Sequence, residues 1–184
     1  GLRAAPVGNI GVPILDALRD PQGYDALVVE LSSFQLHRLG SESGSGVSPY
    51  ASVCLNIADD HLDWHGSFDA YVAAKANVYE RTQVACVYNR ADERTMRMVE
   101  EADVVEGARA VSFGLDSPPS SGFGVVEGLL LDRAYHAERR NEAYELVSVE
   151  ELSQRGLHAP HMVQNILAAA ALARSRGVEP AQIA

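Results

Sequence analysis

Short, almost continuously apolar runs alternate along this chain with segments in which apolar residues recur every three or four positions. A short apolar run is typical of a buried strand in a parallel sheet, and the longer periodic segments are typical of helices. The alternation predicts an α/β fold, a three-layer sandwich around a mostly parallel sheet. The expected strands cover 4–9, 25–32, 50–57, 84–89 and 108–114, and the expected helices cover 12–20, 67–81, 91–102 and 160–176.

The pattern changes after Phe113, where a loop rich in proline, glycine and serine interrupts the alternation. Two apolar runs follow, GVVEGLLLDR at 124–133 and AYELVSV at 143–149, separated by a charged segment. Such runs are typical of the two arms of an antiparallel hairpin. We therefore expect a small antiparallel hairpin or sheet in addition to the parallel one.

Composition narrows the class of protein. With 184 residues, 47% hydrophobic and 22% charged, the chain is long enough for one soluble globular domain. It has no apolar run of the roughly 20 residues that a membrane helix needs, and no export leader, so we expect a cytoplasmic protein. The net charge of −10 argues against a nucleic-acid partner. Cys54 and Cys86 lie inside apolar runs and are expected to be buried free thiols.

One lysine, Lys75, stands among fourteen arginines, and its position is unusual. On the helix expected over 67–81 it lies in the middle of the apolar face, with Tyr71 and Tyr79 among its neighbours. It could extend its ammonium group to water along that face. Alternatively, a partly dry pocket would favour the neutral amine, which can act as a base, form a Schiff base, or take up CO2 as a carbamate that binds a metal.

Acidic and histidine side chains follow the strands that precede this helix. Glu30 ends one apolar strand, and His61 lies in the acidic loop ADDHLDWHG at 58–66 after the next. Because ligand sites of parallel α/β sheets lie beyond the carboxyl ends of the strands, this spacing suits a hard divalent cation. We interpret His65 as a loop residue rather than as a second ligand. A salt-bridged Glu30 at the rim of the sheet remains the alternative.

Five sequence blocks resemble, in order, the central domain of the Mur ligase family. The resemblance covers the chain almost from end to end. One block is most similar to the ligases that add D-glutamate to UDP-N-acetylmuramoyl-L-alanine, although the loop DHLDWHG is also close to relatives that add diaminopimelate or lysine. The blocks are GNIG at 8–11, ELSSFQL at 30–36, NIADDHLDWHG at 56–66, AYVAAKANVY at 70–79 and HMVQNILAAAALA at 161–173.

The resemblance implies an ATP-dependent, amide-forming ligase of peptidoglycan synthesis. ATP phosphorylates the substrate carboxylate, the amine of D-glutamate attacks the acyl phosphate, and phosphate leaves as the amide forms. Mg2+ ions bridge ATP and the carboxylate. By their places in the matching blocks, Glu30 and His61 are implied as Mg2+ ligands, and Lys75 as a carbamylated lysine that helps to hold the second Mg2+.

The resemblance also implies contacts with the substrate and the nucleotide. Asn9 and Ser32 match positions near the muramoyl substrate, and Asn165 matches an asparagine that contacts adenine. Met162 departs from the family pattern, which often has a second asparagine there. These assignments are carried over from the family and remain expectations.

The family has further parts that residues 1–184 do not contain: a UDP-binding domain, a phosphate loop of the GxxGK[ST] type, and a C-terminal domain. We therefore expect a central-domain fragment of a monomeric enzyme, inactive alone and with an exposed sheet edge where the phosphate-loop strand is missing. Two alternatives belong to other classes of protein. One is a metal-dependent hydrolase with a carbamylated lysine, for which the histidines are poorly arranged, and the other is a non-catalytic binding protein of the same fold.

Overall fold

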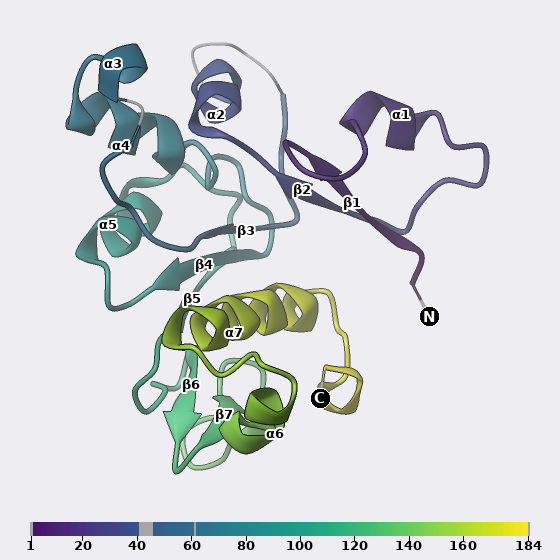
Figure 1. Ribbon diagram of the computed structural model, residues 1–184, viewed down its shortest axis with the longest axis vertical. Coiled ribbons are helices and arrows are strands. Elements are labelled where there is room, and N and C mark those ends of the chain that lie inside the picture. The colour runs from purple at the N-terminus through teal and green to yellow at the C-terminus, as the bar shows by residue number, and fades with distance from the viewer. Residues whose placement is uncertain (1, 41–45, 61, 184) are drawn as a thin grey trace.

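The computed structural model describes residues 2–40, 46–60 and 62–183, and its elements form a layered α/β arrangement (Figure 1). The strands are β1 (Ala4–Gly8), β2 (Ala26–Glu30), β3 (Ala51–Cys54), β4 (Ala85–Asn89), β5 (Arg109–Phe113), β6 (Gly122–Val126), β7 (Leu129–Asp132) and β8 (Tyr144–Ser148). The helices are α1 (Ile14–Leu18), α2 (Ser33–Leu39), α3 (Leu62–His65), α4 (Phe68–Ala76), α5 (Glu93–Glu101), α6 (Val149–Gln154), α7 (Pro160–Ser175) and the short 3-10 helix η2 (Pro180–Gln182).

The larger sheet has the strand order β3-β4-β5-β6-β7-β8. Strands β3 to β6 are parallel, and β7 and β8 continue the same sheet in antiparallel pairing. The expected antiparallel pairing of the two runs is confirmed by β7 and β8, and the run 124–133 adds a further turn at Glu127 and Gly128 that separates β6 from β7. Both residues have positive φ, 50° and 80°, as a tight two-residue turn requires. The antiparallel strands extend the parallel sheet.

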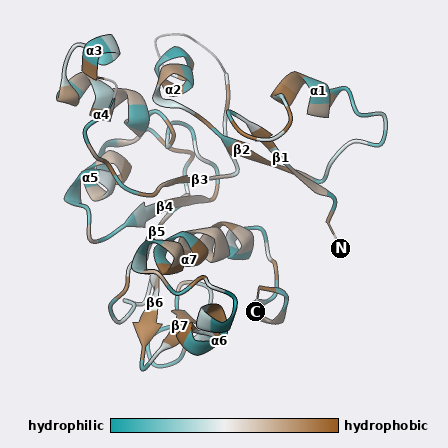
Figure 2. Cartoon of the chain, viewed as in Figure 1, coloured by the Kyte–Doolittle hydropathy of each residue, from teal (hydrophilic) through white to brown (hydrophobic). Residues whose placement is uncertain are grey.

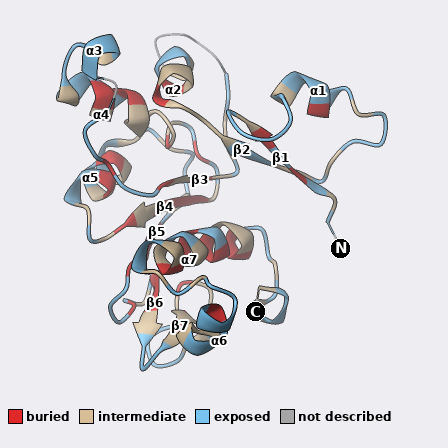
Figure 3. Cartoon of the chain, in the orientation of Figure 1, coloured by how far each residue is buried: buried red, intermediate tan, exposed pale blue. Residues whose placement is uncertain are grey.

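Alternating side chains of the central strands divide the core into two faces. Ala85 and Val87 of β4 pack with α7, whereas Cys86 between them packs with side chains of α4 and α5. Successive residues of a strand point to opposite faces, so helices cover both sides of this sheet. Figure 3 shows the buried residues gathered on these strands and on α7. The predicted three-layer sandwich is confirmed here.

Strands β1 and β2 form a separate parallel pair, although the sequence pattern predicted one parallel sheet. Their core is small: Ala5, Val7 and Ala17 are its buried members. Val28 and Val29 of β2 remain 59% and 42% exposed, and Figure 2 shows the hydrophobic character of this pair. Within the described part of the chain, β2 pairs only with β1 and β3 only with β4, so β2 and β3 are both edge strands there.

Helices α2, α3 and α6 were not predicted, since each has fewer than two full turns of apolar periodicity. Capping boxes define two of them: Ser32 with Gln35 begins α2, and Ser148 with Glu151 begins α6. Helix α4 ends at Ala76, earlier than expected, and turns continue the chain to β4. The described helices all fall short of what a membrane span requires in length and apolar character.

Candidate functional site

The carboxyl ends of β1 and β2 bring two predicted site residues together. Gly8 ends β1 with a φ of 108°, and a Cβ atom on it would lie 2.2 Å from the carbonyl oxygen of Glu30. Only glycine fits this position. The next amide, that of Asn9, donates a hydrogen bond of 2.9 Å to the same oxygen. The GNIG sequence therefore places Asn9 directly beside Glu30.

Glu30 carries a buried carboxylate oxygen that is short of a partner. Its side chain lies at the end of β2, and its Oε2 atom is buried without a hydrogen bond in the described structure. A buried carboxylate oxygen is costly unless a cation or donor meets it. Carboxylates are preferred ligands of Mg2+, so this atom fits a bound cation. The alternative was a salt bridge at Glu30, but among the described residues no ion pair includes Glu30.

The hydroxyl of Ser32 has a structural role at the start of α2. It accepts from the amide of Gln35 at 3.3 Å and donates to the Gln35 side-chain oxygen at 3.1 Å. The amide of Ser32 donates to the same side-chain oxygen at 2.8 Å. These bonds fix the first turn of the helix. A contact with substrate would have to share a hydroxyl that already caps α2.

Tyr79 joins the end of β3 to the middle of β4. Its hydroxyl accepts from the amide of Cys54 at 2.9 Å and donates to the carbonyl of Val87 at 2.7 Å. Tyr79 is fully buried, and burial holds the pKa of its phenol well above the usual range. The neutral hydroxyl therefore serves as donor and acceptor between the two strands where β3 ends.

The loop after β3 is held by residues at the end of β4. Asn89 donates to the carbonyl of Leu55 at 3.0 Å, and the amide of Ile57 donates to Asp92 Oδ2 at 2.8 Å. Arg94 donates to the carbonyl of Ile57 at 3.2 Å. These bonds set the path of the segment that leads into the acidic loop. The sequence predicted none of these bonds and indicated only that Asp92 belongs to the helix expected over 91–102.

Lys75 lies half-buried on α4, on the helix face that packs against the sheet. Its charge acts on Cys54: burial raises the pKa of that thiol to about 11, and the nearby ammonium group opposes the rise. The only lysine of the chain thus lies near Cys54 at the end of β3, on the side of α4 that it shares with Tyr71 and Val72. Its predicted place on the apolar face is confirmed.

The acidic loop is described in part. His61 lies outside the described residues, so the structure gives no geometry for it. Asp59, Asp60 and Asp63 are exposed. His65, expected in a loop, is instead the last residue of α3 and is half-buried. Within the described ranges, no group of three or more histidine, cysteine or carboxylate side chains is arranged to hold a metal ion.

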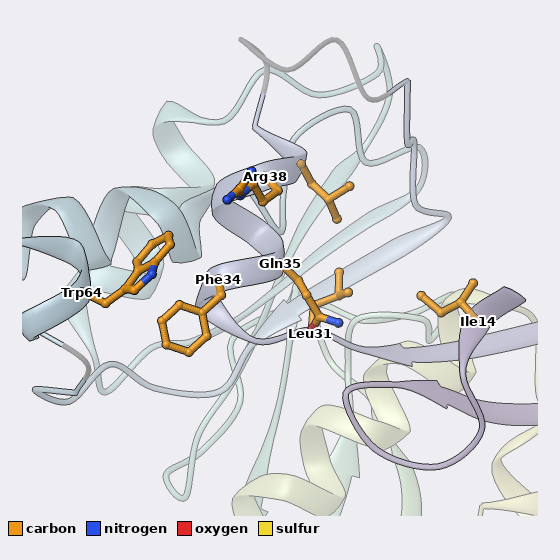
Figure 4. Close-up of a pocket in the computed structure, with 7 residues that line it drawn as sticks. Ile14, Leu31, Phe34, Gln35, Arg38 and Trp64 are labelled. Carbon is orange, nitrogen blue, oxygen red and sulfur yellow. The ribbon is translucent and has the colours of Figure 1, made fainter.

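An apolar groove of about 540 Å³ opens beside this region (Figure 4). Leu31, directly after Glu30, forms part of its wall, and Phe34 and Trp64 line one end. Among the lining residues that the structure describes, Arg38 brings the one charged side chain. The groove adds an apolar surface next to the strand ends. Its other lining residues are Ile14, Gln35 and Leu39.

Asn165 does not join these residues. It is exposed on α7, and α7 packs on the face of the sheet opposite α4 and α5. The structure therefore brings Asn9, Glu30 and Ser32 together at the end of β2 and places Lys75 near the end of β3. A nucleotide contact at Asn165 would approach from the other side of the sheet.

Comparison with known proteins identifies the family. A family model described as the Mur ligase middle domain matches residues 7–173. The chain belongs to the Mur ligase family. The match confirms the resemblance to the central domain of this family that the five sequence blocks indicated.

Relatives and solved structures agree with this assignment. The chain is 67% identical over 180 residues to the UDP-N-acetylmuramoylalanine–D-glutamate ligase of Leifsonia xyli subsp. xyli, covering 98% of the chain and 35% of that ligase. The chain is 51% identical over 183 residues to the ligase of the same name from Streptomyces coelicolor, and the match covers 100% of this chain and 37% of that ligase. The chain thus spans little more than a third of these relatives.

Two solved structures share the fold. A UDP-N-acetylmuramoyl-L-alanyl-D-glutamate–2,6-diaminopimelate ligase superposes with a TM-score of 0.71 at 22% identity, over 98% of this chain and 39% of that one. MurF from Acinetobacter baumannii gives a TM-score of 0.60 at 17% identity, and the match covers 98% of this chain and 44% of that one. At these identities the likeness concerns the fold, and it confirms the α/β class.

Proposed function

We propose that this Mur ligase domain is the middle part of an ATP-dependent ligase that joins D-glutamate to UDP-N-acetylmuramoyl-L-alanine in peptidoglycan synthesis. The observation that carries the proposal is the 67% identity, over 98% of the chain, to a ligase of that name. The orphaned carboxylate oxygen of Glu30 at a strand end supports it independently. Because ATP and the nucleotide-linked substrate are cytoplasmic compounds, the proposal places the enzyme in the cytoplasm.

The proposal includes Mg2+ held by Glu30, His61 and Lys75. When bound, Mg2+ would neutralise the crowded oxygens of the phosphates and of the reacting carboxylate. Glu30 contributes a buried oxygen that lacks another partner. Lys75 contributes an amine that can become a carbamate, which an arginine at this position could not.

Substrate and nucleotide contacts complete the proposed site. Asn9 lies beside Glu30 through its backbone bond to the Glu30 carbonyl and is exposed toward solvent, as a substrate contact must be. Ser32 lies two residues beyond Glu30 and is half-buried. Asn165 is exposed on α7 and is proposed to contact adenine. The proposed partners are therefore ATP, UDP-N-acetylmuramoyl-L-alanine and D-glutamate.

A strand from elsewhere in the full-length protein is proposed to complete the sheet. The unpaired edges of β2 and β3, and the exposed Val28 and Val29, support a parallel strand between them. The phosphate loop expected from the family would follow that strand. We propose that the 184 residues form no amide without these parts, and that the full enzyme is a monomer.

The test is an assay of the full-length protein with ATP, Mg2+, UDP-N-acetylmuramoyl-L-alanine and D-glutamate. We expect amide formation with release of ADP and phosphate. Glu30→Gln should lower kcat by about 100-fold or more. Even the loss of a residue that only orients a metal ligand lowers metal affinity or activity by about 10–100-fold. Glu93→Gln, an exposed glutamate on α5, is the matched control and should keep full activity.

Other outcomes would select another function. Amide formation with diaminopimelate or lysine, and none with D-glutamate, would assign the enzyme to the ligases of the next steps. Absence of ATP turnover with every amine would favour a non-catalytic binding protein of this fold.

A further inference from the structure

An aromatic cluster joins α2, the helix that follows the strand bearing Glu30, to the segment that bears Lys75. It lies between α2 on one side and the α3–α4 segment on the other, and none of its members is a proposed ligand. Ring centroids within it are 4.6 to 6.2 Å apart. Its members are Phe34, His37, Trp64, His65 and Tyr71.

His65 makes the polar contact across this cluster. Its Nε2 atom shares a hydrogen bond of 3.0 Å with the hydroxyl of Ser33, a residue with 2% exposure. Its ring stacks on Phe34 at 5.8 Å with an interplanar angle of 5°. The ring of Tyr71 makes a T-shaped contact with it, at a centroid distance of 5.4 Å and an interplanar angle of 73°. Ring contacts and one nitrogen of the imidazole thus join α2 with α3 and α4.

The Ser33–His65 contact lies close in sequence to the segments that carry the proposed metal ligands. Ser33 is the first residue of α2 and lies three residues after Glu30. His65 is followed at once by Gly66 and by Ser67, whose hydroxyl caps the helix that carries Lys75. A movement at the Ser33–His65 contact therefore changes the separation between the Glu30 carboxylate and the Lys75 amine.

A second bond supports the same docking farther along the helices. Asn77, at the end of α4, donates to the carbonyl of Leu36 in α2 at 3.0 Å. Two points of attachment fix both the distance between the helices and their relative rotation. Along the chain, the Ser33–His65 contact is the attachment nearer to Glu30, whereas Asn77 lies two residues after Lys75.

We propose that His65 is a positioning residue of this ligase. Through Ser33 and Phe34 it sets the distance between the strand end bearing Glu30 and the helix bearing Lys75, and it does not itself touch the reacting atoms. Ligands of a metal site must be held to within about 0.5 Å, and residues that orient them commonly change metal affinity 10–100-fold. The inference rests on the proposed function where it names the ligase site.

The experiment compares His65→Ala, Ser33→Ala and the double variant in the full-length protein. Mn2+ serves as the probe, and its dissociation constant is measured by water-proton relaxation in the presence of a non-hydrolysable ATP analogue. We expect each single variant to weaken Mn2+ binding about tenfold. The double variant should bind Mn2+ no more weakly than the single variant with the lower affinity, because both changes remove the same contact.

Kinetics separate positioning from loss of substrate binding. His65→Ala should lower kcat about tenfold while KM for D-glutamate stays within about twofold. His65→Gln, which can still reach Ser33 with its amide, should recover part of the loss. His37→Ala is the matched control, because it removes a ring from the same cluster without touching Ser33, and it should leave Mn2+ binding and kcat unchanged.

Unchanged Mn2+ affinity in His65→Ala and Ser33→Ala would overturn the proposal, as would equal losses in His37→Ala. If His65→Ala fails to fold, Ser33→Ala, which removes one hydroxyl, decides. If the wild-type protein forms no amide but His65→Ala still weakens Mn2+ binding, the proposed function fails and the positioning role stands.

Discussion

A buried ion pair fixes the end of helix α7. Arg174 donates from Nε to Asp132 Oδ2 at 2.8 Å, and Asp132 is fully buried. The same guanidinium donates to the carbonyl of Val178 at 2.6 Å and lies 5.1 Å from the ring centre of Tyr144. One side chain thus joins β7, β8 and the segment that follows α7.

Arg174→Ala should lower the free energy of unfolding by about 3–5 kcal/mol, because it leaves the Asp132 carboxylate buried without its counter-charge. Urea unfolding of the 184-residue chain measures the effect. Arg176→Ala is the control: this exposed arginine lies over the ring of Tyr50 at 5.1 Å and should cost less than about 1 kcal/mol. Equal losses would contradict the role given to the ion pair.

Helix α5 and the loop after β3 are organised by one carboxylate. Asp92 Oδ1 accepts from the amide of Arg94 at 3.1 Å and caps the helix. Its Oδ2 accepts from the amide of Ile57, a buried residue 35 positions earlier. The cap of one element therefore also fixes the strand-end loop that leads to the proposed metal ligands.

Asp92→Ala should lower the free energy of unfolding by about 2–4 kcal/mol, since it removes a helix cap and leaves a buried amide unpaired. Ser148→Ala, which removes the exposed cap of α6, is the comparison and should cost about 1 kcal/mol. Chemical denaturation of both variants tests the difference. Similar values would mean that the bond to Ile57 contributes nothing measurable.

The whole molecule consists of two sheets with very different cores. In the described part of the chain the larger sheet buries residues on both faces, whereas the small core that β1 and β2 share with α1 has three buried residues, and β2 has an exposed edge. Local opening is governed by the apolar contacts that a region must break. The β1–β2 pair, which carries Asn9 and Glu30, is therefore the less stable part of the 184-residue chain.

Native-state hydrogen exchange should reveal this difference. In the 184-residue chain, we expect amides of β1 and β2 to exchange at least about 100-fold faster than those of β4 and β5. In the full-length protein this difference in exchange rate should become smaller if a further strand pairs with β2. Equal protection of both sheets in the 184-residue chain would contradict the separation.

The sequence by itself was enough to select those proposed site residues whose signal is local. Glu30 ends an apolar strand, and Lys75 is a lone lysine on the apolar face of a helix, so a short window of residues was enough to find them. The alternation of strands and helices and the five family blocks are equally local patterns. They determined the α/β class and the family, both of which are confirmed.

Tertiary structure alone decided the contacts between distant segments. The bond of His65 to Ser33 spans 32 positions, that of Ile57 to Asp92 spans 35, and Tyr79 joins two strands through one hydroxyl. It also decided that β1 and β2 stand apart and that β7 and β8 extend the parallel sheet. Periodicity reports which face of an element is apolar, whereas strand order and hydrogen-bond partners depend on which faces and edges meet in space.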